Sequence, residues 1–233
     1  MRPRFLALHR RHFYLAAVGL VAACARPGAT VPAGAFAPVP RESLAALAAR
    51  TAPVRREILR IRWRSDDGRI ALSGQGAVRV APPDSMRVDV AVRLGVGRAT
   101  LILAGEGVAA EPREIVEQVL PDRFALWAAL GVIRMPDGAD TVGRLEDGAR
   151  TLWRAAASDG RTTTFELRGD TLVGVTREVD GRGVARLWLT RGADGRVARA
   201  QVTDLQRGAR FEVQITGSAP SEAFPSEIWR LRP

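Results

Sequence analysis

Apolar and charged residues alternate one by one along much of this chain, and this period of two restricts its fold more than any other feature. Leu59, Ile61 and Trp63, for example, alternate with three arginines. Successive side chains of a strand point to opposite faces, so each such stretch has one apolar and one charged face. This pattern is typical of an antiparallel sheet with one face in water. It predicts about eleven strands, at 59–64, 70–80, 86–93, 100–104, 107–110, 150–157, 162–168, 171–178, 183–190, 196–204 and 209–216.

Asp-Gly dipeptides separate several of the expected strands, as at 180–181 and 194–195. Asp-Gly favours the tight turns of β-hairpins, because both residues tolerate a positive φ. Turn formation therefore explains most of the acidic residues more economically than catalysis does.

Three helices are expected in addition to the strands. Residues 41–52 form the first, which Pro53 ends. Residues 112–119 and 122–130 form two more, inserted after the fifth strand, and Gly131 ends the last of them. The tail at 224–229 is expected to add a final edge segment. The predicted fold class is α+β, mainly antiparallel β.

The N-terminus has the three parts of a secretory signal. Residues 1–12 carry four arginines and no acid, and an apolar run of 13–23 follows and ends in small residues. This run is shorter than the roughly 20 residues that span a membrane. The arginine pair at 10–11 fits twin-arginine export as well as general secretion, and both routes stay open.

Cys24 is the only cysteine, and it directly follows this apolar run. The stretch 21–24, Val-Ala-Ala-Cys, resembles the lipobox of bacterial lipoproteins, in which the cysteine becomes the acylated first residue. An ordinary signal or an uncleaved anchor with a chance cysteine is the alternative. Ala25 in place of Asp favours the outer membrane over the inner one, since Asp there favours inner-membrane retention in well-studied Gram-negative bacteria.

The chain thus divides into three expected parts: a signal peptide at 1–23, an acylated cysteine with a linker at 24–40, and one globular domain at 41–233. Residues 25–40 contain four prolines and no apolar period. Such a segment is partly extended and would hold the domain away from the membrane surface.

The residues missing after position 24 limit the chemistry. Both histidines and the only tyrosine precede Cys24, and the chain has no lysine. Most general bases, activated nucleophiles and soft metal ligands come from these residue types. We therefore expect no enzyme, no metal and no cofactor, although a hydrolase with two carboxylates stays formally possible. The net charge is +10, but the arginines are scattered and form no nucleic-acid motif.

The order of these elements resembles the LolA/LolB superfamily of lipoprotein carriers and receptors. The shared order is an exported lipoprotein with a leading helix, a meander of strands, a helical insertion and a second meander. Two local stretches, 124–136 and 77–89, also resemble the family's central segment and its second hairpin.

The resemblance implies a half-open barrel whose apolar concave face is covered by a helical lid and holds acyl chains of a lipid or lipoprotein. The candidate lining is Leu59, Ile61, Trp63, Met86, Val88, Val90, Phe124, Trp127 and Trp153. The alternative is that these residues form an ordinary closed core, since any sheet must bury its apolar face.

Leu94 lies in the loop between the third and fourth expected strands. LolB-like receptors have a protruding apolar residue in the corresponding loop, and the resemblance gives that role to Leu94. A plain hairpin turn with two glycines is the alternative.

The sequence therefore predicts a non-enzymatic lipoprotein of the cell envelope that binds acyl chains of a lipid or lipoprotein. Its expected partners are the membrane, through the acylated Cys24, a lipid or lipoprotein, and a periplasmic carrier protein; nucleic acid is not expected. A scaffold with a closed core that docks one protein partner is the competing hypothesis.

Overall fold

The computed structural model describes residues 35–93, 97–105, 107–113 and 123–230. Within these ranges no helix is long and apolar enough to cross a membrane. The strands are β1 (Ala37–Pro38), β2 (Glu57–Asp66), β3 (Ala71–Ala81), β4 (Ser85–Val92), β5 (Arg98–Ala104), β6 (Gly107–Glu111), β7 (Ala139–Asp147), β8 (Arg150–Ala157), β9 (Arg161–Arg168), β10 (Thr171–Val179), β11 (Arg182–Arg191), β12 (Val197–Asp204) and β13 (Arg210–Pro220). The helices are α1 (Arg41–Thr51), α3 (Arg123–Ala129) and the 3₁₀ helix η1 (Ser226–Trp229).

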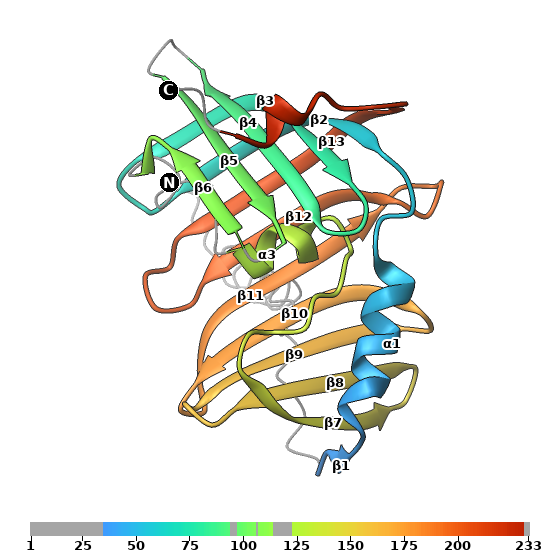
Figure 1. Ribbon diagram of the computed structural model, residues 1–233. Helices are drawn as coiled ribbons and strands as arrows, with labels where there is room; N and C mark the ends of the chain where they lie inside the picture. The colour runs from blue at the N-terminus through green and yellow to red at the C-terminus, as the bar shows by residue number, and fades with distance from the viewer. Residues whose placement is uncertain (1–34, 94–96, 106, 114–122, 231–233) are drawn as a thin grey trace, which may run out of the picture. The chain divides into compact units, whose positions relative to one another are not determined.

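All thirteen of these strands belong to one antiparallel sheet with the order β1-β7-β8-β9-β10-β11-β12-β13-β2-β3-β4-β5-β6. Two meanders, β2 to β6 and β7 to β13, are joined where the last strand pairs with β2 (Figure 1). In this pairing Val213 lies opposite Trp63. The end strands β1 and β6 do not pair with each other in the described part of the chain, so the sheet is not closed.

The alternation along β2 has the predicted effect. Leu59, Ile61 and Trp63 are buried, whereas the arginines between them are exposed. Burying one large apolar side chain contributes about 1.5–3 kcal/mol, which favours this face over the charged one as the inner face.

The Asp-Gly turns also have their predicted role. Asp180 and Gly181 have φ values of 51° and 73°, as a tight hairpin turn requires. Asp67 accepts hydrogen bonds from the backbone N–H groups of Arg69 and Ile70 at 2.8 and 2.7 Å. These two bonds lower the pKa of Asp67, and the bond from Ile70 has the larger effect. The acid at this turn is therefore explained by backbone geometry.

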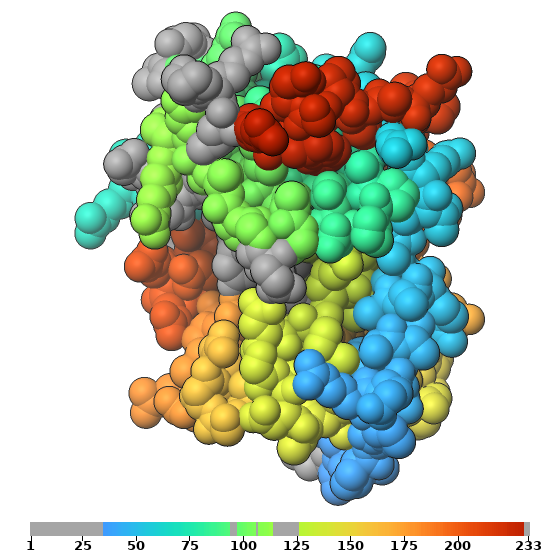
Figure 2. All heavy atoms as spheres, viewed as in Figure 1, coloured from blue at the N-terminus to red at the C-terminus, as the bar shows by residue number. Residues whose placement is uncertain are grey.

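Two helices lie against the inner face of the sheet. Leu44 and Leu47 of α1 are 0% and 2% exposed, and α1 ends just before Pro53 as expected. The helix α3 contacts β11 and β12. Figure 2 shows α1 in blue beside the yellow segment that follows α3. The helices α1 and α3 thus cover part of the inner face of the sheet.

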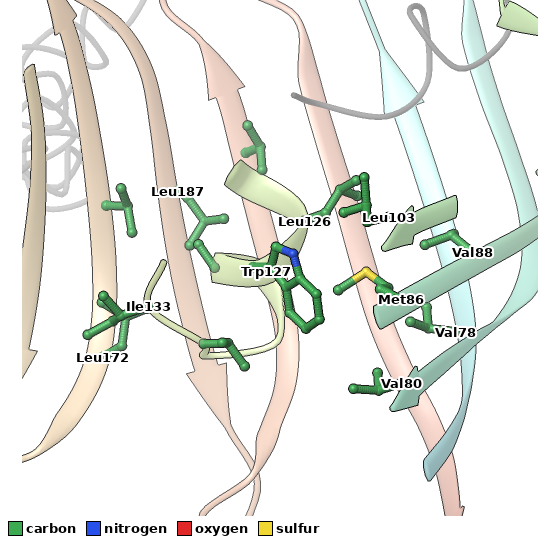
Figure 3. Close-up of a cluster of buried hydrophobic side chains, with 14 of the residues drawn as sticks. Val78, Val80, Met86, Val88, Leu103, Leu126, Trp127, Ile133, Leu172 and Leu187 are labelled. Carbon is green, nitrogen blue, oxygen red and sulfur yellow. The ribbon is translucent and has the colours of Figure 1, made fainter. Parts of the chain in front are cut away.

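The buried side chains of the two meanders and the helices form one hydrophobic cluster. In Figure 3 the ring of Trp127 lies between Met86 of β4 and Ile133 of the segment after α3. Ile133 is 0% exposed, although it belongs to a stretch outside helices and strands. The segment after α3 is thus part of the core and connects the halves of the sheet.

Two of the thirteen strands, β1 and β7, were missed by the prediction of about eleven. In β7 a bulge between Ala139 and Thr141 interrupts the alternation, and few of its residues are apolar. The strand β1 has two residues, too few for any period. It pairs with β7, and Val39 donates its N–H to Val142 O at 3.0 Å. The pairing of β1 with β7 therefore adds residues 37–38, which lie in the expected linker, to the sheet.

The prediction that residues 224–229 add an edge segment to the sheet was wrong. Residues 226–229 form η1, which contacts β4 and β5 on their outer face. Arg87 holds η1 there by donating a hydrogen bond to Ile228 O at 2.6 Å. Pro225 directly precedes η1, and its fixed φ suits the start of a helix. Proline also lacks the backbone N–H that a strand would use in pairing. The residues expected to form the helix at 112–119 lie mostly outside the described ranges.

Asp89 is the centre of a charged cluster on this outer face. It pairs with Arg79 at 2.5 Å and Arg87 at 2.9 Å, and it accepts a hydrogen bond from Thr100 Oγ1 at 2.9 Å. Burial by itself raises the pKa of Asp89, but the hydrogen bonds and the two guanidinium charges outweigh it and keep the pKa below its usual value.

Candidate functional site

The expected lining residues of β2 and β4 lie in the hydrophobic core. All six are between 1% and 5% exposed and belong to the single buried cluster. These residues are Leu59, Ile61, Trp63, Met86, Val88 and Val90. They pack against one another and against neighbouring strands, so a lining role for them stays a prediction.

The other expected site residues are in different surroundings. Trp127 is 3% exposed and central to the core, whereas Trp153 is half-buried, with the Arg144 guanidinium 5.3 Å from its ring centroid. Phe124 belongs to α3, but its side chain is outside the described part of the structure, as are Leu94 and Cys24.

Several polar contacts hold the segment after α3 in place. Arg134 lies over the Trp127 ring, 4.3 Å from its centroid, and donates a hydrogen bond to Pro83 O at 2.8 Å. The backbone N–H of Ile133 donates to Thr51 Oγ1 at 2.8 Å. These bonds tie the segment to the tip of the β3–β4 hairpin and to the end of α1. It therefore forms a fixed wall above the inner face of β7 to β10.

A cavity of about 400 Å³ lies beneath this wall. Its floor consists of small side chains from β7, β8 and β9, namely Ala139, Ala155, Ala157 and Thr163. The wall above is formed by Trp127, Arg134, Met135, Pro136 and Asp137. Two further arginines, Arg161 and Arg177, line it from β9 and β10, and Asp84 and Gly105 line it from two hairpin tips. The small floor residues leave this space because they cannot reach the wall.

The cavity is apolar on one side and charged on the other. Arg161 pairs with Asp159 at 2.7 Å. Burial lowers the pKa of Arg177. In the described ranges no group of three His, Cys, Asp or Glu residues is placed to hold a metal ion. The cavity therefore offers a bound molecule both an apolar surface and guanidinium hydrogen-bond donors.

A second, more open hollow of about 730 Å³ lies between the end of α1, β2 and the β11–β12 turn. Leu59 lines it together with charged residues, of which Arg196 and Glu57 pair at 2.5 Å. Trp63 lines a third hollow of about 580 Å³ beside Gly74. Among the described residues, a residue of α3 lines the cavity beneath Trp127 but neither of these two hollows, so that cavity is the stronger candidate site.

Most of the residues that line the cavity were not predicted from the sequence. Of the expected lining, Trp127 reaches it, whereas the floor residues and both β9 and β10 arginines were not singled out. A usable signal was present: the expected strand 150–157 ends in three alanines, and the next strand carries three threonines at 162–164. Small residues on adjacent strands indicate a place where a sheet face is not filled.

Comparisons with known proteins agree on the fold. No protein-family model matches the chain, and no curated protein matches it. Solved structures do match. A LolA superfamily protein from Nitrosomonas europaea superposes with a TM-score of 0.60 at 10% identity, over 85% of this chain and 99% of that one. A candidate outer membrane lipoprotein-sorting domain from Vibrio parahaemolyticus superposes with a TM-score of 0.51 at 10% identity, over 80% and 94% of the two chains.

These two matches extend over most of the sheet domain, and at this identity they concern its fold. They confirm the LolA-like fold that the element order predicted, with a mainly antiparallel sheet that is not closed in the described part of the chain. The chain has the fold of the LolA superfamily.

Proposed function

We propose that this chain is a non-enzymatic lipoprotein of the cell envelope that binds an acyl chain of a lipid or lipoprotein in the cavity beneath Trp127. The fold supports this, because the two similar structures are a LolA superfamily protein and a candidate lipoprotein-sorting domain. The signal-like N-terminus supports it as well, because it directs the chain to the compartment where such cargo occurs.

The cavity itself is the observation that carries the proposal. Its volume of about 400 Å³ lies within the usual range of roughly 300–1,000 Å³ for small-molecule sites. Alanines and Trp127 give it apolar walls. Each methylene buried there would contribute about 0.8 kcal/mol. Part of an acyl chain would therefore bind with several kcal/mol before ordering costs.

Cys24 would serve as the membrane anchor in this proposal. Two or more acyl chains hold a protein stably on a bilayer, whereas one does so only marginally. The proline-rich linker would let the domain reach cargo, or a periplasmic carrier protein, at a distance from the membrane, with the outer membrane as the proposed location. Metabolic labelling with an alkyne fatty acid tests the anchor: the wild type should be labelled and Cys24→Ser should not.

Acyl binding is tested with the full chain carrying Cys24→Ser, which has no acyl group of its own. Lipid that co-purifies is identified by mass spectrometry, and a fluorescent fatty acid is titrated. Ala157→Leu fills the cavity and should weaken probe binding about 10- to 100-fold, because the added side chain takes the place of several methylenes.

Ala156→Leu is the matched control, because Ala156 is the next residue on β8 and points to the opposite face. It should leave probe affinity unchanged. Equal affinity of both variants and the starting protein, or a complete lack of acyl binding, would contradict the proposal.

A scaffold function is the second candidate, and one observation favours it. The six expected lining residues of β2 and β4 are at most 5% exposed and belong to one buried cluster, as a core would require, although Leu59 and Trp63 also reach two open hollows. Crosslinking in intact envelopes separates the two functions. One stoichiometric protein partner without bound lipid would favour the scaffold, and co-purified lipid without such a partner would favour the carrier.

A further inference from the structure

Four residues of β8 to β11 form a row across the outer face of the sheet. Arg154 of β8 is paired with Thr164 of β9, Thr164 with Thr176 of β10, and Thr176 with Arg186 of β11. Residues directly opposite each other on antiparallel strands share a face. Arg154 directly precedes Ala155 of the cavity floor, and neighbouring residues of a strand point to opposite faces. This outer row of two arginines and two threonines is therefore on the face away from the cavity.

Both arginines of the outer row lack an acidic partner. Arg154 lies over the Phe36 ring, 3.9 Å from its centroid, and Arg186 lies 5.9 Å from the ring centroid of Trp188. No carboxylate in the described ranges forms an ion pair with either guanidinium. Thr164, between them, is 3% exposed, and neither its Oγ1 nor the Nε of either arginine has a hydrogen-bond partner in those ranges. The outer row thus carries two positive charges that no described side chain neutralises.

Arginine also predominates around the outer row. On this face of β8 to β13 the register places six arginines and three acids. Glu166 is paired with Arg150 at 3.4 Å, and Glu212 is paired with Arg199. Glu178 has no ion pair in the described part of the chain. The arginines without an ion pair in that part are Arg154, Arg168, Arg186 and Arg210. The unpaired charge of this face is therefore mostly positive and complements an anionic surface.

The two guanidinium groups of the outer row are aimed apart. Phe36, just before β1, holds that of Arg154 toward one end of the sheet, whereas Arg186 lies beside Trp188 of its own strand. Three strand separations of roughly 4.8 Å place the two backbones about 14 Å apart. One small anion is therefore a poor fit to both arginines, whereas a bilayer presents many headgroup phosphates side by side. Trp188 is half-buried on the same face, and tryptophan is enriched where proteins meet the membrane–water interface.

Phe36 also shows where the chain toward Cys24 leaves the sheet domain. Gly143 of β7 is paired with Arg154, and an ideal Cβ on Gly143 would lie 2.8 Å from Phe36 Cβ. Phe36 thus packs on the outer face, in the space that the absent side chain leaves. Eleven residues separate Phe36 from Cys24, and a fully extended chain of this length spans at most about 40 Å. With Cys24 acylated as proposed, the bilayer surface is within this reach, which favours a bilayer over a soluble acidic protein as the partner.

We propose that the outer row docks on an anionic bilayer, where Arg154 and Arg186 contact headgroup phosphates. The cavity beneath Trp127 then faces away from the membrane, toward cargo or a carrier protein. The inference rests on the proposed anchor at Cys24 for the choice of a bilayer, and it adds the orientation of the anchored domain. The charges themselves are a property of the sheet, so docking can be measured without the anchor.

Co-sedimentation with vesicles tests the docking. The protein is the processed chain, residues 24–233 with Cys24→Ser, so neither an acyl group nor the arginines of residues 1–12 contribute. Vesicles of phosphatidylcholine with phosphatidylglycerol are compared with vesicles of phosphatidylcholine alone. The chain should bind the anionic vesicles at least about 10-fold more tightly. Raising the salt from about 0.1 M to about 1 M shortens the screening length from about 10 Å to about 3 Å and should abolish this preference.

The double variant Arg154→Gln/Arg186→Gln should weaken binding to the anionic vesicles about 10- to 30-fold, because each basic residue at an anionic surface contributes about fivefold. Arg154→Lys/Arg186→Lys keeps both charges and should retain most of the binding. Arg41→Gln/Arg69→Gln is the matched control, because it removes two exposed arginines, one on α1 and one in the β2–β3 turn, that have no ion pair in the described ranges. It should change binding by no more than about twofold. Thermal melting verifies that each variant is folded.

The outcomes separate this inference from the function beneath it. Equal binding to both kinds of vesicle, or no binding to either, would overturn the inference and leave an acidic protein as the partner of this face; this comparison needs no variant. Equal losses in the outer-row variant and the control would show that net charge, and not the outer row, directs the binding. Acyl binding in the cavity is measured separately with the fluorescent fatty acid, so its failure would contradict the proposed function without changing the vesicle result.

Discussion

Gly74 is the position where the addition of one methyl group should damage the sheet most. It lies on β3 opposite Trp63 of β2. An ideal Cβ built on Gly74 would overlap the backbone oxygen of Ala91 on β4, and it would lie 2.7 Å from Trp63 Nε1. Real Cβ atoms essentially never approach other atoms this closely. Gly74→Ala therefore forces either β4 or the Trp63 ring to move.

The expected cost of Gly74→Ala follows from two opposing effects. Replacing glycine by alanine in a compatible place stabilises a protein by about 0.4–1 kcal/mol, because the unfolded chain loses conformational freedom. Overpacking a filled core costs about 1–3 kcal/mol or more. The backbone overlap places the overpacking cost of Gly74→Ala at the upper end of this range. The shifted Trp63 ring would also lose its stacking on Phe211, whose ring centroid is 6.3 Å away. We expect a net destabilisation of about 1–3 kcal/mol.

Urea unfolding measures this change, with Gly217→Ala as the matched control. An ideal Cβ on Gly217 of β13 meets nothing within 4 Å, so this variant should be neutral or slightly stabilised. A loss of 1–3 kcal/mol corresponds to a fall in melting temperature of roughly 2–12 °C for a domain of this size. The reasoning is refuted if Gly74→Ala and Gly217→Ala unfold at the same urea concentration.

Two further predictions concern the outer and inner faces of the sheet. Asp89→Asn should lower the urea midpoint at pH 7, because the folded pKa of Asp89 is depressed. The contribution of Asp89 is fully present above its unfolded pKa of about 3.9 and is lost as the pH falls through the lower folded value, so the gap between the midpoints of wild type and variant should narrow as the pH falls below about 3.9. A gap that stays constant from pH 7 into this acid range would contradict the prediction. Leu44→Ala should lower the free energy of unfolding by about 2–5 kcal/mol, since Leu44 is 0% exposed. The control Val54→Ala, whose side chain is 91% exposed, should change it by no more than about 0.5 kcal/mol. Equal urea midpoints of the two variants would show that α1 is not part of the core.

Much of the fold could be predicted from local patterns. The alternation in β2 and β4 identified both the strands and their buried faces, because burying one face requires a period of two. Pro53 and Gly131 correctly marked the ends of two helical segments. The prediction failed where the local pattern is weak: β7 is interrupted by its bulge, and η1 is held by Arg87, whose distant position in the chain no local rule reveals.

The candidate site was much less predictable. The large apolar residues of β2 and β4 were expected to line a cavity; they belong to the buried cluster, Leu59 and Trp63 also reach open hollows, and the lining role stays a prediction. The cavity beneath Trp127 lies where side chains are small, at Ala155 and Ala157, and where Trp127 forms a wall above them. Hydrophobicity alone does not distinguish these two cases, because both kinds of residue are apolar.

The sequence by itself determined which faces of the strands are buried, where the hairpins turn and where α1 ends, since each depends on neighbouring residues and on backbone geometry. Only the tertiary structure decided that β13 pairs with β2, and that Arg177 continues the alanine floor. These facts depend on contacts between segments far apart in the chain. Alternation shows that a face is covered, but not which side chains meet on it or how much space they leave.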